Sequence, residues 1–228
     1  LSVVLDNPLP ASTGRVCQHP CDDRCRREAI DEAVNMREVH RAIADQVYLT
    51  ERFEPLVARV LEQKMPASGK HVAVVGAGPT GLTFAYYMAL RGHDVTCFES
   101  RPAAGGMLRY ALPEYRLPQA VLDKEIELIE RTGEEFRFGV EVGKDVTLNV
   151  IDDQYDAVFH SIGTWKEAWV HLAGTELTGV IPALPFLEAM AREDEVPVGR
   201  NVVVIGGGNA AVDSARSARR LGSVVTIV

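Results

Sequence analysis

The sequence predicts an α/β fold of the doubly wound kind, preceded by a polar helical segment. Segments of strand and helix character alternate from His71 to the last residue, as in parallel sheets with crossover helices. The expected strands are short, continuous apolar runs, which is typical of strands covered on both faces. A strand, a glycine-rich turn and a helix also follow one another twice, beginning at Val72 and at Val202. These observations predict two related strand-turn-helix units in one chain.

Residues 1–66 are polar and are expected to form a helical domain. Helices are predicted over residues 31–45 and 50–63, where apolar residues recur with helical spacing. Thr50 is the expected N-cap of the second helix. Residues 65–70 are expected to be a linker, because Pro, Ser and Gly follow one another there. The apolar stripe of the second helix consists of Phe53, Leu56, Val57, Val60 and Leu61.

The alternating part of the chain is expected to divide at residue 196. The first domain, residues 67–196, has predicted strands over 72–75, 94–98 and 155–162 and predicted helices over 80–90, 118–131 and 184–191. The second domain begins at residue 197, with a strand over 201–205, a helix over 209–221 and a strand over 223–228. Both domains are expected to be incomplete, so we interpret the chain as the interior portion of a larger subunit.

Composition argues against several classes of protein. The 228 residues are 46% hydrophobic and 25% charged, close to the average of globular proteins. Asp and Glu outnumber Lys and Arg by 32 to 24, so we expect no nucleic-acid-binding face. The longest apolar runs fall far short of the roughly 20 residues of a membrane span. The first ten residues do not resemble a signal peptide, and a cytoplasmic location is expected. Since Leu1 is not an initiator Met, residues upstream of it are expected.

The first glycine motif has the pattern of a dinucleotide-binding turn. Gly76, Gly78 and Gly81 directly follow an apolar strand and open a helix. In such a motif the first glycine allows the tight turn, the second lets the backbone approach a pyrophosphate, and the third lets the helix pack on the strand. The helix N-terminus offers free N–H groups to the phosphates. Glu99 ends the next strand, where an acid that accepts from a ribose hydroxyl is expected.

The loop after Glu99 indicates which dinucleotide binds. Gly105 and Gly106 follow the acid closely, which is the pattern of FAD enzymes of the glutathione-reductase type. An ordinary glycine loop is the alternative. The second motif begins at Gly206, and Ala211 takes its third small position. A second dinucleotide site suggests a nicotinamide cofactor that faces the flavin. The choice between NADH and NADPH is not predicted, because the selecting residues would follow the strand that ends at Val228.

Three of the four cysteines lie within nine residues, at Cys17, Cys21 and Cys25. Thiolates at this spacing suit iron–sulfur ligation, a zinc site or no metal at all, and the spacing alone leaves all three open. Cys97 lies in an apolar stretch and is expected to be a buried strand residue.

An ordered set of motifs carries a more specific resemblance. It comprises 7–10 and 14–17, Cys21 and Cys25, 76–81, 105–110, 113–118, 156–159, 162–164 and 206–209. Over nearly its whole length the chain resembles the glutamate synthase small (β) subunit and its relatives, which include the flavin half of dihydropyrimidine dehydrogenase and the large subunit of NADH-dependent ferredoxin:NADP oxidoreductase.

This resemblance implies an electron-transfer flavoprotein. It implies a helical domain with [4Fe–4S] clusters, an FAD domain and an inserted NAD(P)H domain. Hydride passes from NAD(P)H to the flavin, and single electrons leave through the clusters to another redox subunit or ferredoxin in a hetero-oligomeric complex. Cys17, Cys21 and Cys25 match cluster ligands, and His40 is the position best aligned with an unusual Gln or Glu ligand of relatives. The alternative for His40 is a solvated helix histidine.

The resemblance also implies a set of cofactor-binding residues. For FAD they are Gly76, Gly78, Pro79, Gly81, Glu99, Gly106, Met107, Leu108, Arg116, Val142, Gly163 and Thr164. For NAD(P)H they are Gly206, Gly208, Asn209 and Ala210. For Arg116, a surface arginine is the alternative.

No general acid or base is expected, because the flavin carries the chemistry. The alternative functions are a thioredoxin-reductase-type enzyme, which would need a C-x-x-C that the sequence lacks, and a non-catalytic scaffold or assembly subunit of a redox complex.

Overall fold

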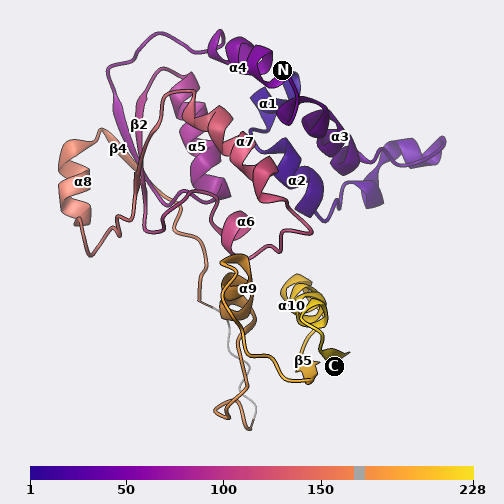
Figure 1. Ribbon diagram of the computed structural model, residues 1–228. Coiled ribbons are helices and arrows are strands. Elements are labelled where there is room, and N and C mark those ends of the chain that lie inside the picture. The colour runs from indigo at the N-terminus through magenta and orange to yellow at the C-terminus, as the bar shows by residue number, and fades with distance from the viewer. Residues whose placement is uncertain (167–172) are drawn as a thin grey trace.

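The computed structural model describes residues 1–166 and 173–228 (Figure 1). It contains an N-terminal helical region, a four-stranded parallel sheet with helices on both faces, and a smaller unit with two parallel strands. The two sheets confirm the predicted parallel α/β architecture. None of the described helices combines the length and the apolar character that crossing a membrane requires.

The N-terminal region packs on the sheet unit rather than standing apart from it. Leu9 and Ala11 of this region share one apolar core with Leu122 and Leu128 of the sheet unit. One apolar core therefore includes residues from both sides of the expected boundary at residue 66. The helices of the region are α1 (Ser2–Asp6), α2 (Pro10–Val16), α3 (Met36–Tyr48) and α4 (Phe53–Leu61), with short 3₁₀ turns at Asp22–Arg24 and Arg26–Ala29.

The predicted starts of two N-terminal helices are wrong. α3 begins at Met36 rather than at Asp31, because the Asn35 side chain accepts the Glu38 N–H and caps the helix there. The N-cap of α4 is Arg52 rather than Thr50. The Thr50 hydroxyl instead donates to carbonyls at the end of α3, at 2.9 Å and 3.1 Å.

The four-stranded sheet has the order β3-β2-β1-β4, with all strands parallel. The chain runs outward from β1 to β2 and β3 and then returns to the other side of β1. The strand order therefore reverses at the carboxyl end of β1, which is where doubly wound sheets bind their ligands. The strands are β1 (His71–Val75), β2 (Asp94–Glu99), β3 (Glu135–Phe138) and β4 (Ala157–His160).

Helices cover both faces of this sheet. Figure 1 shows α5 and α7 on one side and α8 on the other. α5 carries apolar residues all round because it lies between the sheet and α7. On the opposite face, Ile151 of α8 packs against Ala73 and Phe98 of the sheet. The helices are α5 (Pro79–Leu90), α6 (Met107–Tyr110), α7 (Gln119–Glu130) and α8 (Leu148–Gln154).

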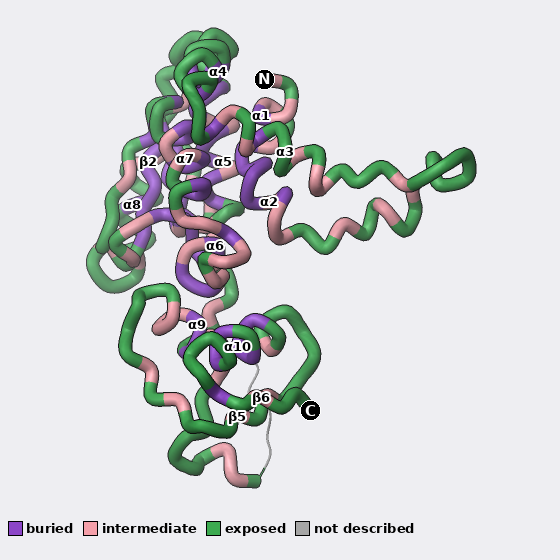
Figure 2. Tube along the Cα trace, turned by 45° about the vertical axis from the view of Figure 1, so that its right-hand side comes forward, coloured by how far each residue is buried: buried purple, intermediate pink, exposed green. Residues whose placement is uncertain are grey.

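The second unit has a small core of its own. Phe186 and Leu187 pack with Ala218 on the neighbouring helix. Figure 2 shows that most of this unit is exposed, whereas the burial concentrates around α5 and α7. Its elements are α9 (Ala183–Ala191), β5 (Asn201–Val204), α10 (Asn209–Arg220) and β6 (Val224–Ile227), with β5 parallel to β6. The helices α1, α2, α6 and α8 and the strand β3 are elements that the sequence did not predict.

Candidate functional site

The turn between β1 and α5 requires glycine at two of its positions. Gly76 has φ +99°, and a Cβ there would lie 2.5 Å from the Ser161 carbonyl oxygen. A Cβ on Gly81 would lie 1.9 Å from the Gly76 carbonyl oxygen. Both distances are far inside van der Waals contact, so these glycines are demanded by the close packing of the turn, the helix and the segment after β4.

The N-terminus of α5 is open for an anion. Gly78 is the N-cap and has no side chain to cap the helix, and Pro79 occupies the first helical position. The N–H groups of the first turn have no carbonyl partner within the helix, and the helix dipole favours negative charge there. Gly106 lies opposite, and a Cβ on it would approach the Gly78 Cα to 2.7 Å. Two backbones without side chains therefore form a cradle that fits the pyrophosphate of a dinucleotide.

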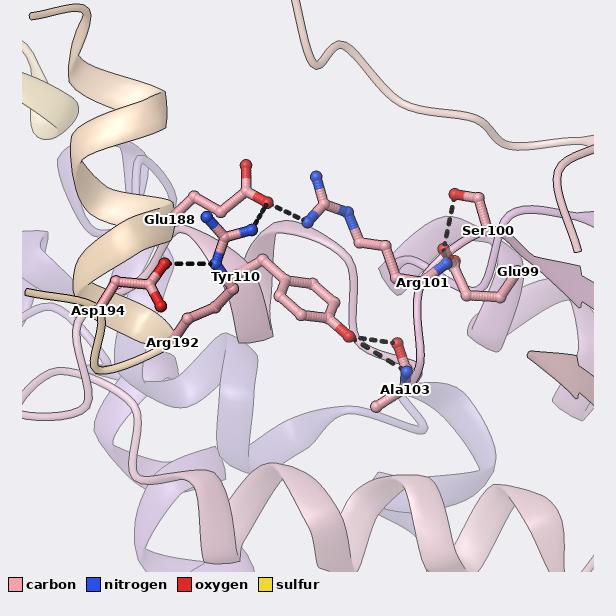
Figure 3. Close-up of polar contacts among 8 residues, drawn as sticks. All are labelled: Glu99, Ser100, Arg101, Ala103, Tyr110, Glu188, Arg192 and Asp194. Carbon is pink, nitrogen blue, oxygen red and sulfur yellow. Dashed lines mark hydrogen bonds and ion pairs between the residues drawn. The ribbon is translucent and has the colours of Figure 1, made fainter. Parts of the chain in front are cut away.

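The Glu99 carboxylate holds two loops of this site together. Figure 3 shows it beside Ser100 and Arg101. It is buried at the end of β2 and accepts the Ala77 N–H at 2.8 Å and the Arg101 N–H at 2.9 Å. The Ser100 hydroxyl donates to it as well, at 3.3 Å. A carboxylate has about four acceptor positions, so one remains for a ribose hydroxyl. Glu99 therefore lies beside the glycine turn, and its role at a ribose stays a prediction.

Two further segments approach the same edge of the sheet. The Val140 N–H donates to the Glu99 carbonyl at 3.0 Å, so the segment with Val142 runs beside the end of β2. Ser161 follows β4, and its hydroxyl donates to the Gly76 carbonyl at 2.9 Å. Gly163 and Thr164 come directly after it and are exposed, with Gly163 at φ +70°. The structure therefore brings the segments that carry most of the predicted FAD residues to one edge.

Two predicted flavin residues, Leu108 and Arg116, have other contacts in this structure. Leu108 on α6 belongs to the apolar core and Met107 beside it is half-buried. The Arg116 guanidinium pairs with the carboxylate of Asp213, which is nearly fully buried on α10. Arg116 therefore connects the sheet unit to the second unit. Tyr115 adds to this connection, because its hydroxyl donates to the Asp213 carbonyl at 3.4 Å.

The second glycine motif repeats the backbone geometry of the first. Gly206 has φ +115°, and its N–H donates to Val228 at 2.8 Å, as that of Gly76 donates to Phe98 at 2.8 Å. Gly208 caps α10 with φ −76° and ψ 176°, against −75° and −179° for Gly78. Asn209 and Ala210 are exposed in the first turn of α10.

A cavity of about 820 Å³ runs along β5 and this turn, and Gly206, Gly208 and Ala210 contribute to its wall. The predicted NAD(P)H-binding residues Gly206, Gly208 and Ala210 therefore line a space that is open to a ligand.

The three clustered cysteines lie on an exposed segment that projects from the helical region (Figure 2). The Val34 N–H donates to the Cys25 sulfur at 3.4 Å, and this hydrogen bond lowers the pKa of the Cys25 thiol. His40 lies on α3, with its Nδ1 3.5 Å from the Asn7 amide nitrogen. Within residues 1–166 and 173–228, no three His, Cys, Asp or Glu side chains gather closely enough to hold a metal ion.

As arranged here, Cys17, Cys21, Cys25 and His40 do not gather into one ligand set. Their assignment as ligands stays a prediction. Cys97 is buried, as expected, and burial raises the pKa of its thiol.

Sequence reasoning missed the residues that link the two units. Arg101 contacts Trp165 and Glu188, and Arg116 pairs with Asp213, although these partners are far apart in the chain. Asp213 closes the second glycine motif, but its burial is known only from the structure, so no sequence signal pointed to it as a link between the units.

This pair of glycine turns on parallel sheets is the architecture of a dinucleotide-dependent oxidoreductase. The chain belongs to the pyridine nucleotide-disulphide oxidoreductase family, whose pattern residues 70–228 match.

Among named proteins, the chain is 40% identical over 234 aligned positions to the NADP(+)-dependent formate dehydrogenase subunit beta of Moorella thermoacetica, covering 94% of this chain and 33% of that protein. It is 35% identical to the NADPH-Fe(3+) oxidoreductase subunit beta of Geobacter sulfurreducens, covering 98% and 33%. It is 32% identical to the glutamate synthase [NADPH] small chain of Bacillus subtilis, covering 94% and 44%. These relatives confirm the predicted resemblance. The chain spans about a third to under half of their lengths.

Solved structures share the fold. FprA from Mycobacterium tuberculosis in complex with NADPH aligns with a TM-score of 0.57 and 26% identity, covering 67% of this chain and 36% of that chain. A 2-naphthoyl-CoA reductase aligns with a TM-score of 0.60 and 27% identity, covering 74% and 24%.

Proposed function

We propose that this chain is the flavin-binding part of an oxidoreductase subunit that passes electrons between NAD(P)H and a redox partner. The observation that carries the proposal is the duplicated glycine turn. Both turns have a positive-φ first glycine, both are anchored to the end of the neighbouring strand, and both present an uncapped helix N-terminus. Two such sites in one chain suit two dinucleotides, one bound on each unit.

The first unit suits FAD because of three features. The N-terminus of α5 would hold the pyrophosphate, the cradle of Gly78 and Gly106 would admit it closely, and Glu99 would accept a ribose hydroxyl. When bound, a flavin accepts a hydride and releases single electrons. The part of this chain is then to bind the cofactor, to orient it at the switch point of the sheet and to carry the second nucleotide-binding unit beside it.

The names of the relatives support the second cofactor and the partner. Three of them are named after NADP(+) or NADPH, and the chain aligns with two beta subunits and a small chain. We infer that the nicotinamide cofactor binds at Gly206, Gly208, Asn209 and Ala210, and that the electron acceptor is another subunit of a complex or a ferredoxin. Our proposed iron–sulfur ligands remain Cys17, Cys21 and Cys25, with His40 as a further candidate.

A reduction assay tests the proposal. The full chain is loaded with FAD, and reduction of an artificial dye is followed with NADPH and with NADH. We expect one nicotinamide cofactor to bleach the flavin absorbance and to drive dye reduction. Flavin-loaded protein that stays inactive with both would contradict electron transfer and favour the scaffold alternative. Iron and acid-labile sulfide analysis tests the cluster separately, since bound zinc without sulfide would rule out that assignment.

The role of Glu99 can be tested by substitution. Glu99→Ala removes the ribose acceptor and leaves the Ala77 and Arg101 N–H groups without their partner. A hydrogen bond to a charged group contributes about 1.5–3 kcal/mol, so we expect FAD affinity to fall by roughly one to two orders of magnitude. Quenching of flavin fluorescence on titration measures this. Glu141→Ala is the matched control, because Glu141 is an exposed acid on the neighbouring segment. The FAD affinity of this variant should equal that of the wild type.

A further inference from the structure

Arg101 makes contacts to both units of the molecule (Figure 3). Its guanidinium pairs with the Glu188 carboxylate on α9, and both side chains are three-quarters buried or more. The same guanidinium lies 4.0 Å from the centroid of the Trp165 ring and 4.7 Å from that of Tyr110. The cation therefore lies against two aromatic rings as well as a carboxylate. A planar guanidinium suits this combination better than the point charge of a lysine.

The backbone of Arg101 belongs to the proposed flavin site. Its N–H donates to Glu99 Oε1 at 2.9 Å, and its carbonyl accepts the Gly139 N–H at 3.2 Å. A ribose hydroxyl that binds Glu99 adds a further partner to the same carboxylate. Ligand binding there would restrict the loop from which the Arg101 side chain extends.

The other end of the contact belongs to the second unit. Phe186 and Leu187 of α9 pack with Ala218 of α10, so α9 and the helix that follows the second glycine turn share one core. A restraint on Glu188 therefore restrains the whole small core of that unit. Glu188 Oε1 also accepts a hydrogen bond from Arg192 at 3.2 Å, but Arg192 caps α9 itself and does not reach the sheet unit.

We propose that Arg101 is a positioning residue that couples occupancy of the flavin site at Glu99 to the placement of α9 and, through it, of the second nucleotide-binding unit. The inference rests on the proposed function, because it takes FAD as the ligand at Glu99. Coupling is reciprocal, so a nicotinamide cofactor on the second unit also strengthens FAD binding through the same contact.

Hydrogen exchange of the α9 amides, measured on the full chain with and without FAD, tests the coupling. In the wild type we expect FAD to slow exchange over residues 183–191 by about fivefold or more, the lower end of usual coupling between sites. In Arg101→Gln we expect FAD to bind without slowing these amides. Arg192→Gln is the matched control, since it removes the other ion pair of Glu188 and leaves the bridge to Arg101 intact. It should behave as the wild type.

The outcomes separate this inference from the function on which it rests. If FAD protects α9 equally in the wild type and in Arg101→Gln, the inference is overturned and the flavin function stands. The same holds if Arg101→Gln and Arg192→Gln lose the protection to the same extent. Wild-type protein that binds no FAD would overturn both. If Arg101→Gln does not fold, Glu188→Ala cuts the same ion pair from the α9 side and is expected to lose the protection in the same way.

Discussion

At the scale of single residues, Glu125 is a fully buried carboxyl that joins the helical region to the sheet unit. It lies on α7 and accepts hydrogen bonds at the N-terminus of α2, from the Ala11 N–H at 2.6 Å, the Ser12 N–H at 3.1 Å and the Ser12 hydroxyl. It therefore caps a helix that lies more than a hundred residues earlier in the chain. Burial raises the pKa of Glu125 to about 7.

The raised pKa predicts a pH dependence of stability. A carboxyl whose pKa is higher in the fold than its ordinary 4.5 binds its proton more tightly in the folded state. Its contribution to stability is therefore present below about pH 4.5 and is lost as the pH rises toward 7. The free energy of unfolding should therefore change less between pH 4.5 and 8 in Glu125→Gln than in the wild type, by roughly 1–3 kcal/mol. Urea unfolding across this pH range measures the difference.

Glu134 provides the comparison for that measurement. Burial raises its pKa to about 7 as well, but its carboxylate accepts from the Thr132 hydroxyl two residues away rather than from the start of a distant helix. The Glu134→Gln variant should reduce the pH dependence of stability over the same pH range without loosening α2. Full wild-type pH dependence in Glu125→Gln would contradict the prediction.

The requirement for glycine at position 81 can also be tested by substitution. Gly81→Ala would place a Cβ 1.9 Å from the Gly76 carbonyl oxygen, so α5 must shift away from β1. We expect a loss of about 3 kcal/mol in the free energy of unfolding, together with loss of FAD binding. Gly208→Ala is the control, because a Cβ there meets no atom within 4 Å. Similar losses in the two variants would show that the close approach is not the cause.

At the scale of elements, a buried acid and two arginines of α10 contact the sheet unit. The Asp213 side chain is only 4% exposed and pairs with Arg116, while Arg216 and Arg220 stack over the Tyr115 ring at 4.5 Å and 3.6 Å. Removing one partner of a buried pair leaves the other charge without compensation.

The pair therefore predicts a non-additive result. Arg116→Met alone should destabilise the protein by about 3 kcal/mol, because Asp213 stays buried without its partner. The double variant Arg116→Met with Asp213→Leu should recover most of that loss, since a buried ion pair is often replaceable by apolar residues. Chemical denaturation followed on both variants measures the difference. A double variant less stable than Arg116→Met would be inconsistent with this account.

At the scale of the whole molecule, the projecting cysteine segment is separate from the nucleotide sites. Residues 17–35 are mostly exposed and contribute no member to the apolar cores. Replacing Cys17, Cys21 and Cys25 by Ser together should leave the flavin content of the purified protein unchanged. The same variant should lose any bound iron, measured with flavin on one sample. A parallel loss of flavin would mean that the segment supports the FAD site.

Local pattern was sufficient for the glycine turns. A strand, a turn and a helix that follow one another in the chain determine the spacing from Gly76 to Gly81. They also place Glu99 at the end of the next strand, so the parallel units were predictable without coordinates. The short elements were not. β3 and α8 have four and seven residues, too few for a clear periodicity, and they form because the sheet and its opposite face offer them partners.

The contacts between units required the folded structure. Ser12 and Glu125 lie 113 residues apart, Arg101 and Glu188 lie 87 apart, and Arg116 and Asp213 lie 97 apart. No periodicity relates residues at such separations, because their meeting depends on how helices pack on the sheet. The chain's own pattern therefore specified what each glycine turn can bind, since a turn is built from neighbouring residues. Only the packed molecule specified how the two turns are held relative to one another, since that depends on buried pairs between distant side chains.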